Sequence, residues 1–189
     1  MIRTGDTIVN PVTGERITFL RTSADTNGES VLIETAVEPG GFVAAAHVHP
    51  YQTERFEVVS GTLAVRVGRK VIELSSGQAA IVPAGTAHRF WNPADETAVF
   101  RCEIRRALRF ESLLETMFAL AADGKTNRKG MPNPLRLAVI ANAHFDTVQL
   151  PFPPALLQRI GLALGAPVGR LAGYTPTYVP AGEPAPALA

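Results

Sequence analysis

The chain has 189 residues, 46% of them hydrophobic and 19% charged, and its 18 lysines and arginines nearly balance 17 aspartates and glutamates. This composition is that of a globular chain that buries its own core, and the length indicates one domain with at most an appendage. A formal net charge of +1, with scattered basic residues, gives no electrostatic reason to expect nucleic acid or an anionic membrane as a partner.

Cysteine content and hydropathy exclude further classes of protein. The single cysteine, Cys102, excludes an intrachain disulfide and a metal cage of several thiolates. The N-terminal residues lack the apolar run of a signal peptide, and no apolar stretch reaches the length of a transmembrane helix. We therefore expect a cytoplasmic protein that does not associate with membranes.

Up to about residue 106 the pattern is that of short β-strands. Apolar and β-branched residues alternate or cluster in short runs, and glycine, proline and asparagine mark turns between them. The runs are 15–22, 30–37, 55–74, 78–83 and 97–104. Many short strands at close intervals predict an antiparallel sandwich or barrel.

From residue 107 the apolar period becomes helical. A first helix is predicted from apolar residues at helical spacing, with Gly124 as its C-terminal stop. A second is predicted to open at Asn133-Pro134, an N-cap followed by proline in the first turn, and a third to span 154–164. Gly161, Gly165 and Gly169 are spaced for close packing on a neighbouring helix or on the barrel.

The predicted organisation follows from this change of period. Residues 1–106 form a β-barrel domain, residues 107–173 a helical extension, and residues 174–189, rich in proline and alanine, an extended or disordered tail. The extension carries no motif that we can attach to chemistry. It is expected to cover one end of the barrel as a lid or to build a dimer interface, and a homodimer is expected.

Two histidines two residues apart raise the question of a metal site. On a strand, His47 and His49 point to the same side, and Glu54 is expected to begin the next strand as a hairpin neighbour. An isolated pair of histidines on a strand is commonly exposed at the surface and binds no metal. His88, at another strand start, supplies a third imidazole, and three histidines with a carboxylate favour a divalent transition metal over packing. His144, on the helical extension, is expected at the surface and not as a fifth ligand.

Two gapped motifs make this interpretation specific. The spacing Gly41-x5-His47-x-His49-x4-Glu54-x6-Gly61 resembles the first motif of the cupin superfamily, and Gly77-x5-Pro83-x-Gly85-x2-His88-x3-Asn92 resembles the second. The resemblance covers roughly residues 30–105. It implies a mainly β fold, a double-stranded β-helix or jelly-roll barrel. It also implies one bound Fe, Mn, Ni, Cu or Zn ion with His47, His49, Glu54 and His88 as ligands, and a structural role for Asn92.

Strand parity suggests what would surround the ion. Residues in phase with the ligands are predicted to face inward, and plain core packing is the alternative for each of them. The pocket candidates are Val43, Ala45, Gln52, Phe56, Val58, Leu63, Val65 and Phe90. Gln52 is expected to be an exposed turn residue unless it supports the ligands, and Arg101 and Glu103 are expected on a solvated face.

The resemblance and the apolar pocket together suggest a function. Three imidazoles and a carboxylate leave one or two positions on an octahedral metal for a small oxygen ligand or substrate. We expect a metal-dependent, oxygenase-like enzyme for a small organic molecule with an apolar part, although no general acid or base stands out. The alternative is a non-catalytic binding or sensing module, and a sugar-type isomerase ranks below both because the pocket lacks polar groups.

Overall fold

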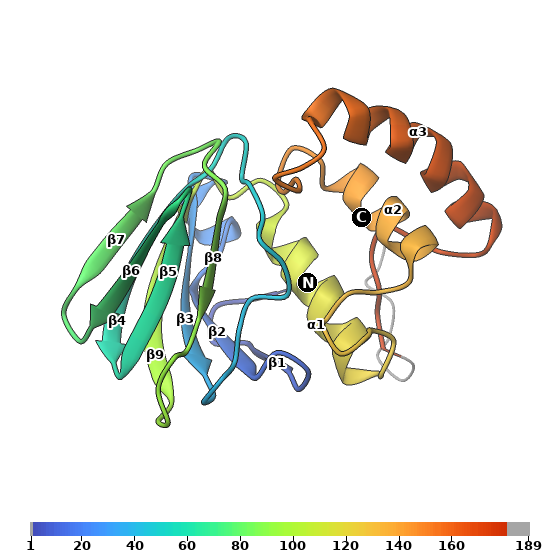
Figure 1. Ribbon diagram of the computed structural model, residues 1–189. Coiled ribbons are helices and arrows are strands. Elements are labelled where there is room, and N and C mark those ends of the chain that lie inside the picture. Colours follow the sequence, from blue (N-terminus) through green and yellow to red (C-terminus); the bar gives the residue numbers. More distant parts are fainter. Residues whose placement is uncertain (1, 181–189) are drawn as a thin grey trace.

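The structure, a computed structural model, describes residues 2–180 (Figure 1). The chain forms strands up to residue 105 and helices after it, apart from a 3-10 turn at Ala24–Thr26. The strands are β1 (Thr7–Asn10), β2 (Glu15–Arg21), β3 (Ser30–Val37), β4 (Thr53–Ser60), β5 (Thr62–Val67), β6 (Lys70–Ser75), β7 (Ala79–Val82), β8 (His88–Trp91) and β9 (Ala98–Arg105). The helices are α1 (Phe110–Ala122), α2 (Pro134–Ala143) and α3 (Ala155–Leu171).

The strands make two antiparallel sheets. One has the order β1-β2-β3-β9-β4-β7 and the other β6-β5-β8. Strands that are distant in sequence lie side by side, since β3 pairs with β9 along its full length, from Ser30 opposite Arg105 to Val37 opposite Ala98. The helices lie to one side of the two sheets, with α1 next to β1 (Figure 1). The predicted mainly β jelly-roll with a C-terminal helical region is confirmed.

Turn glycines divide the strand runs. The run 55–74 breaks into β4, β5 and β6 at Gly61 and Gly68, both of which have positive φ. At Gly61 any other residue is excluded by space as well, because a Cβ would lie 2.8 Å from the carbonyl oxygen of Thr97. The sequence pattern does not reveal β1, which is four residues long and mostly exposed.

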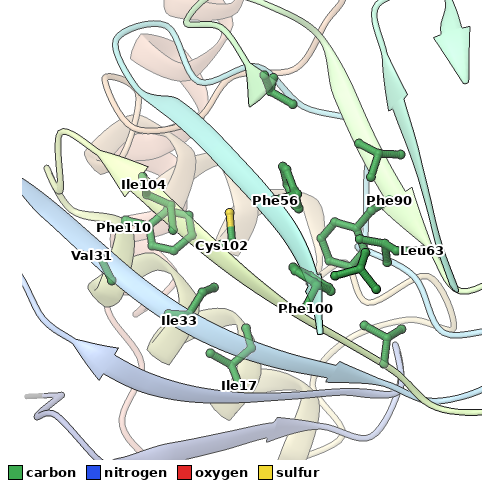
Figure 2. Packing of buried hydrophobic residues seen from close by; sticks show 14 of the residues in the cluster. Ile17, Val31, Ile33, Phe56, Leu63, Phe90, Phe100, Cys102, Ile104 and Phe110 are labelled. Atoms are coloured by element: carbon green, nitrogen blue, oxygen red, sulfur yellow. The ribbon is translucent and has the colours of Figure 1, made fainter. Parts of the chain in front are cut away.

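The core lies between the sheets and follows the predicted alternation (Figure 2). On β9, Phe100 and Cys102 are buried while Arg101 is exposed. The rings of Phe56, Phe90 and Phe100 contact one another, with centroids 5.1 to 6.0 Å apart. Each buried phenylalanine contributes roughly 1.5–3 kcal/mol relative to an exposed one, so the aromatic cluster stabilises the sheet pair.

The first helix ends and the second begins where their cap residues predict. After α1, Gly124 takes the left-handed conformation with φ 66°, which ends the helix. At the start of α2, the side chain of Asn133 accepts a hydrogen bond of 3.0 Å from the backbone N–H of Arg136, with Pro134 in the first turn. Within residues 2–180, no helix combines the length and the hydropathy that crossing a membrane requires.

The predicted end of the third helix is wrong. Instead of stopping at Leu164, α3 continues through Pro167 to Leu171. A proline lacks the N–H that the helix needs and crowds the preceding turn. Packing on α2 compensates, because Gly165 and Gly169 bring the α3 backbone against Ala138 and Leu135.

The α2–α3 contact gives a prediction with an internal control. A Cβ at Gly169 would lie 2.6 Å from the carbonyl oxygen of Leu135, whereas a Cβ at Gly161 meets nothing within 4 Å. We expect Gly169→Ala to destabilise the fold by about 1–3 kcal/mol, because the helices must separate. Gly161→Ala should stabilise it by up to about 1 kcal/mol through helix propensity. Urea unfolding of both variants measures the difference, and equal shifts would contradict the packing.

Part of the predicted tail is described. Residues 174–180 form neither helix nor strand, and the rings of Tyr174 and Tyr178 lie 4.6 and 5.2 Å from the guanidinium carbon of Arg136. This segment therefore contacts the start of α2. Residues 181–189, the rest of the predicted extended or disordered tail, lie outside the described residues.

Candidate metal centre

The four predicted ligands come from three parts of the chain. His47 and His49 lie on the segment that joins β3 to β4, Glu54 lies on β4, and His88 begins β8. The sequence suggested a strand here, but the segment that carries His47 and His49 is not a regular strand. It is held by an isolated bridge in which the N–H of His47 donates to the carbonyl oxygen of His88 at 3.0 Å, and the reverse bond is 2.9 Å.

The expected hairpin between the histidines and Glu54 is also wrong. β4 pairs with β7 and β9 in the larger sheet, whereas the histidine segment pairs with β8 of the smaller sheet. Glu54 therefore reaches the imidazoles across the barrel. Strand spacing alone cannot reveal this, because sheet membership depends on pairings between residues far apart in sequence.

The structure nevertheless brings the four side chains together. Each offers one ligand atom, and these atoms all lie within 4.8 Å of one another. The three imidazole centroids are 4.3 to 5.4 Å apart. His49, Glu54 and His88 are buried and His47 is partly buried. Such a buried, converging set of imidazoles and a carboxylate can hold a divalent metal ion.

Backbone carbonyls orient all three imidazoles. The Nδ1 atoms of His47, His49 and His88 lie 2.9, 2.5 and 3.0 Å from the carbonyl oxygens of Ala45, Thr147 and Thr86. A carbonyl only accepts, so each Nδ1 carries the proton and donates, and each neutral ring keeps a bare Nε2. This is the tautomer that metal-bound histidines adopt, fixed by the same kind of backbone contact.

The bare nitrogens face the carboxylate. Nε2 of His88 lies 2.6 Å from Oε2 of Glu54, and Nε2 of His49 lies 3.4 Å from Oε1. With Nδ1 protonated in both rings, these contacts join acceptor to acceptor, and both Nε2 atoms and Oε2 lack a hydrogen-bond partner among the described residues. Lone pairs at this distance repel unless a cation lies between them. The residues present therefore fit a metal ion, and a proton is the only small substitute.

The electrostatics favour the ligand forms of His47 and Glu54. Burial, with the neighbouring His88 and His49, lowers the pKa of His47 to about 3, so this imidazole stays neutral. Burial alone would raise the pKa of Glu54, but His49 and His88 hold it well below its usual range. For His49, burial opposes protonation, yet the Glu54 carboxylate raises its pKa. In the metal-free protein His49 is therefore more ready than His47 to take the substitute proton.

A largely apolar cavity of about 490 Å³ opens beside the four ligands. Its barrel wall includes four of the pocket candidates, Val43, Ala45, Phe56 and Phe90. Val58, Leu63 and Val65 are buried in the core but do not line it, which is the core-packing alternative. Figure 2 shows Phe56, Phe90 and Cys102 on the barrel side, with Phe110 of α1 among the labelled side chains.

The helical extension supplies the other wall, which strand parity does not reveal. Residues of all three helices line the cavity, among them Leu114, Met117, Ile140 and Leu157. Their apolar periodicity predicts a buried face but not what that face covers. The extension therefore covers the mouth of the barrel, in line with the lid that the sequence suggests.

Gln52 is not an exposed turn residue. Its side chain is 1% exposed, and Nε2 donates to the carbonyl oxygens of Arg106 and Ala107 at 2.8 and 3.1 Å. The amide also helps to raise the pKa of the His49 imidazole. Gln52 thus fixes the turn before Glu54 to the junction between barrel and helices. The only signal for this in the sequence was a polar residue between two predicted ligands.

The expected surface position of His144 is wrong as well. The side chain is 2% exposed, and Nδ1 donates to the carbonyl oxygen of Ile140 at 2.9 Å, which is the C-terminal end of α2. It lies outside the ligand cluster. Asn92 bonds loop backbone as expected, donating to the carbonyl oxygens of Val37 and Glu96. Arg101 and Glu103 lie outside the cavity lining and pair with Glu34 and Arg21.

Comparison with known proteins agrees with this geometry. The family model described as a cupin domain matches residues 33–103. A mannose-1-phosphate guanylyltransferase from Salmonella muenchen is 31% identical over 68 residues, which are 36% of this chain and 14% of that protein. The chain therefore matches only a small part of that relative's length.

Several solved structures are similar to part of the chain. A predicted oxalate decarboxylase from Thermotoga maritima is 17% identical with a TM-score of 0.49, covering 56% of this chain and 98% of that one. A protein from Thermus thermophilus is 26% identical with a TM-score of 0.40, covering 42% and 74%. A sugar phosphate isomerase from a cupin superfamily, from Silicibacter pomeroyi, is 23% identical with a TM-score of 0.46, covering 55% and 67%.

Proposed function

Residues 33–103 form a cupin domain, and from this premise we propose that the chain is a metal-dependent, oxygenase-like enzyme for a small, largely apolar organic molecule. One observation carries the proposal: unpartnered Nε2 and carboxylate atoms converge beside an apolar cavity of about 490 Å³. A cavity of this size accepts a small organic ligand. The fold by itself does not choose the reaction.

The ligand residues would hold one divalent Fe, Mn, Ni, Cu or Zn ion, the identity depending on availability. When bound, such an ion supplies Lewis-acid and, for the redox-active metals, oxygen chemistry at the positions that the protein leaves open. The chain's own contribution is orientation, because backbone carbonyls fix the three imidazole rings. Phe56, Phe90 and the helical wall exclude water from the apolar part of the substrate.

Few titratable groups other than the ligands face the cavity in residues 2–180. Cys102 is one, but burial raises the pKa of its thiol well above the ordinary value, so it stays protonated and does not act as a nucleophile. Glu15, on β2, is the other. A reaction at the metal is therefore expected to need little proton transfer from protein side chains.

Oxygen consumption tests the proposed activity. Protein loaded in turn with Fe, Mn, Ni or Cu is assayed in an oxygen electrode against a panel of enediols and flavonols. We expect turnover with at least one redox-active metal and none in Glu54→Gln, which keeps the shape of the side chain and loses its charge. Absence of turnover with every metal would contradict the enzymatic proposal.

The second candidate is a non-catalytic binding or sensing module. The scarcity of acid–base groups near the ligands favours it. In that case the metal would anchor a small ligand that leaves unchanged. Native mass spectrometry of the purified protein distinguishes the two, because a bound compound recovered chemically intact after incubation with metal and oxygen supports binding alone.

The expected homodimer remains a proposal. On α3, apolar side chains are exposed along one face, among them Ile160, Leu164 and Leu171 at 51%, 71% and 90%. A contiguous apolar face of this kind is typical of a protein interface. Light scattering measures the oligomeric state, and a monomer at high concentration would contradict it.

A further inference from the structure

The cavity reaches a second polar group of side chains on β2 and β3, away from the metal ligands. Glu15 and Thr35 both line the cavity and are both buried. In the register of these strands Glu15 pairs with Val37 and Ile17 with Thr35, so Glu15 and Thr35 are diagonal neighbours on the same inward face. Diagonal partners lie about 7–8 Å apart, so a small group can fit between the two side chains.

The hydroxyl of Thr35 makes no hydrogen bond that would stabilise the fold within the described residues. The residue is 1% exposed, and its Oγ1 has no hydrogen-bond partner within residues 2–180. An unsatisfied buried hydroxyl destabilises a protein, and valine would fill the same space without that cost. A hydroxyl kept unpartnered on a cavity wall is explained if a ligand supplies its partner.

Glu15 is held in place beside it. The hydroxyl of Thr13 donates to Oε2 of Glu15 at 2.6 Å, and the backbone N–H groups of Val12 and Thr13 bind the side-chain oxygen of Asn10 in the same hairpin. Burial raises the pKa of Glu15 to about 7. In either protonation state the carboxyl group can accept a hydrogen bond from a ligand hydroxyl.

The two ends of the cavity are well separated. Thr35 pairs with Phe100 of β9, Val37 beside Glu15 pairs with Ala98, and Glu54 pairs with Ile104 of the same strand. Measured along β9 from the position of Glu54, Thr35 is thus four residues away and Glu15 six. At about 3.3 Å per residue these separations are roughly 13 and 20 Å. Apolar wall lies between the two polar ends.

We propose that Glu15 and Thr35 form a distal subsite that binds a hydroxyl group at the far end of an elongated, otherwise apolar ligand. The ligand hydroxyl would donate to the Glu15 carboxyl group and accept from Oγ1 of Thr35. The proposal rests on the proposed function in taking the metal centre as the anchor for the other end of the ligand. It defines the substrate class as a chain with an oxygen-bearing head and a hydroxylated tail.

Calorimetric titration of the Zn-loaded protein tests the subsite without any turnover. The two probes are 10-hydroxydecanoate and decanoate, which share the carboxylate head and differ at the tail. We expect the wild type to bind the hydroxylated acid about tenfold more tightly, because the two hydrogen bonds outweigh the cost of removing the hydroxyl from water. Thr35→Val removes one of the two hydrogen bonds and should reduce this preference severalfold while binding decanoate as before, and Thr35→Ser, which keeps the hydroxyl, should retain it.

Stability and metal controls separate the possible failures. Thr35→Val is expected to melt no lower than the wild type, so lost preference cannot be attributed to unfolding. Equal preference in wild type and Thr35→Val, no preference in the wild type, or no binding of either acid would overturn the subsite. If Glu54→Gln keeps the tenfold preference, the subsite stands and the metal anchor of the proposed function fails instead.

Discussion

Glu54→Gln is expected to lower the affinity for divalent metal by more than about 100-fold, since changing even an outer-sphere partner costs 10–100-fold. The amide keeps the size of the side chain but removes the negative charge that faces Nε2 of His49 and His88 at 3.4 and 2.6 Å. Elemental analysis after dialysis and calorimetric titration with Zn measure the change. Added metal should raise the melting temperature of the wild type but not of the variant, because only the wild type binds it in the folded state.

Two further variants serve as a second test and as a control for the loss of metal. The double variant His47→Ala/His49→Ala should also lose the metal. His144→Gln is the matched control, because it alters a buried histidine outside the ligand cluster, and it should retain the wild-type metal content. Equal metal in the wild type and the double variant would refute the site.

The stability of the wild type relative to Glu15→Gln is expected to fall as the pH rises from about 5 to 8. Burial raises the pKa of Glu15 from 4.5 to about 7, so the folded state retains a proton that the unfolded state has already lost. The relative stability is therefore greatest below pH 4.5 and is lost as the pH rises through about 7. At 1.36 kcal/mol per pH unit the full difference is about 3 kcal/mol.

Urea unfolding of both proteins across this pH range measures the effect. Other groups, including the metal ligands, titrate in both proteins, so their contributions cancel in the difference between the two curves. A difference that is flat with pH would show that Glu15 titrates near its ordinary value.

The barrel and the candidate ligands could be predicted from the sequence because local patterns of residue type and spacing indicate both. Strand alternation placed Phe56 and Phe100 inward, and turn glycines such as Gly61 marked strand ends. Asn133-Pro134 predicted the start of α2, since a cap involves only neighbouring residues. The four metal ligands followed from two spaced motifs that resemble those of cupins.

The predictions that failed depended on contacts between distant residues. The end of α3 was misjudged because packing on α2 outweighs the local effect of Pro167. Gln52 and His144 were expected outside the core, and both are buried because backbone carbonyls accept their hydrogen bonds. Polar residues give no local sign of whether such a partner exists.

The candidate donor set could be predicted from residue type and spacing, because the two motifs that resemble those of cupins contain all four side chains. How these side chains come together depends on the fold, because His47 and His49 meet Glu54 across the barrel and not along a hairpin. The tertiary structure also decided that the helices close the cavity and that Glu15 and Thr35 share its far end. These arrangements come from strand pairing and helix docking between distant segments, which local periodicity does not encode.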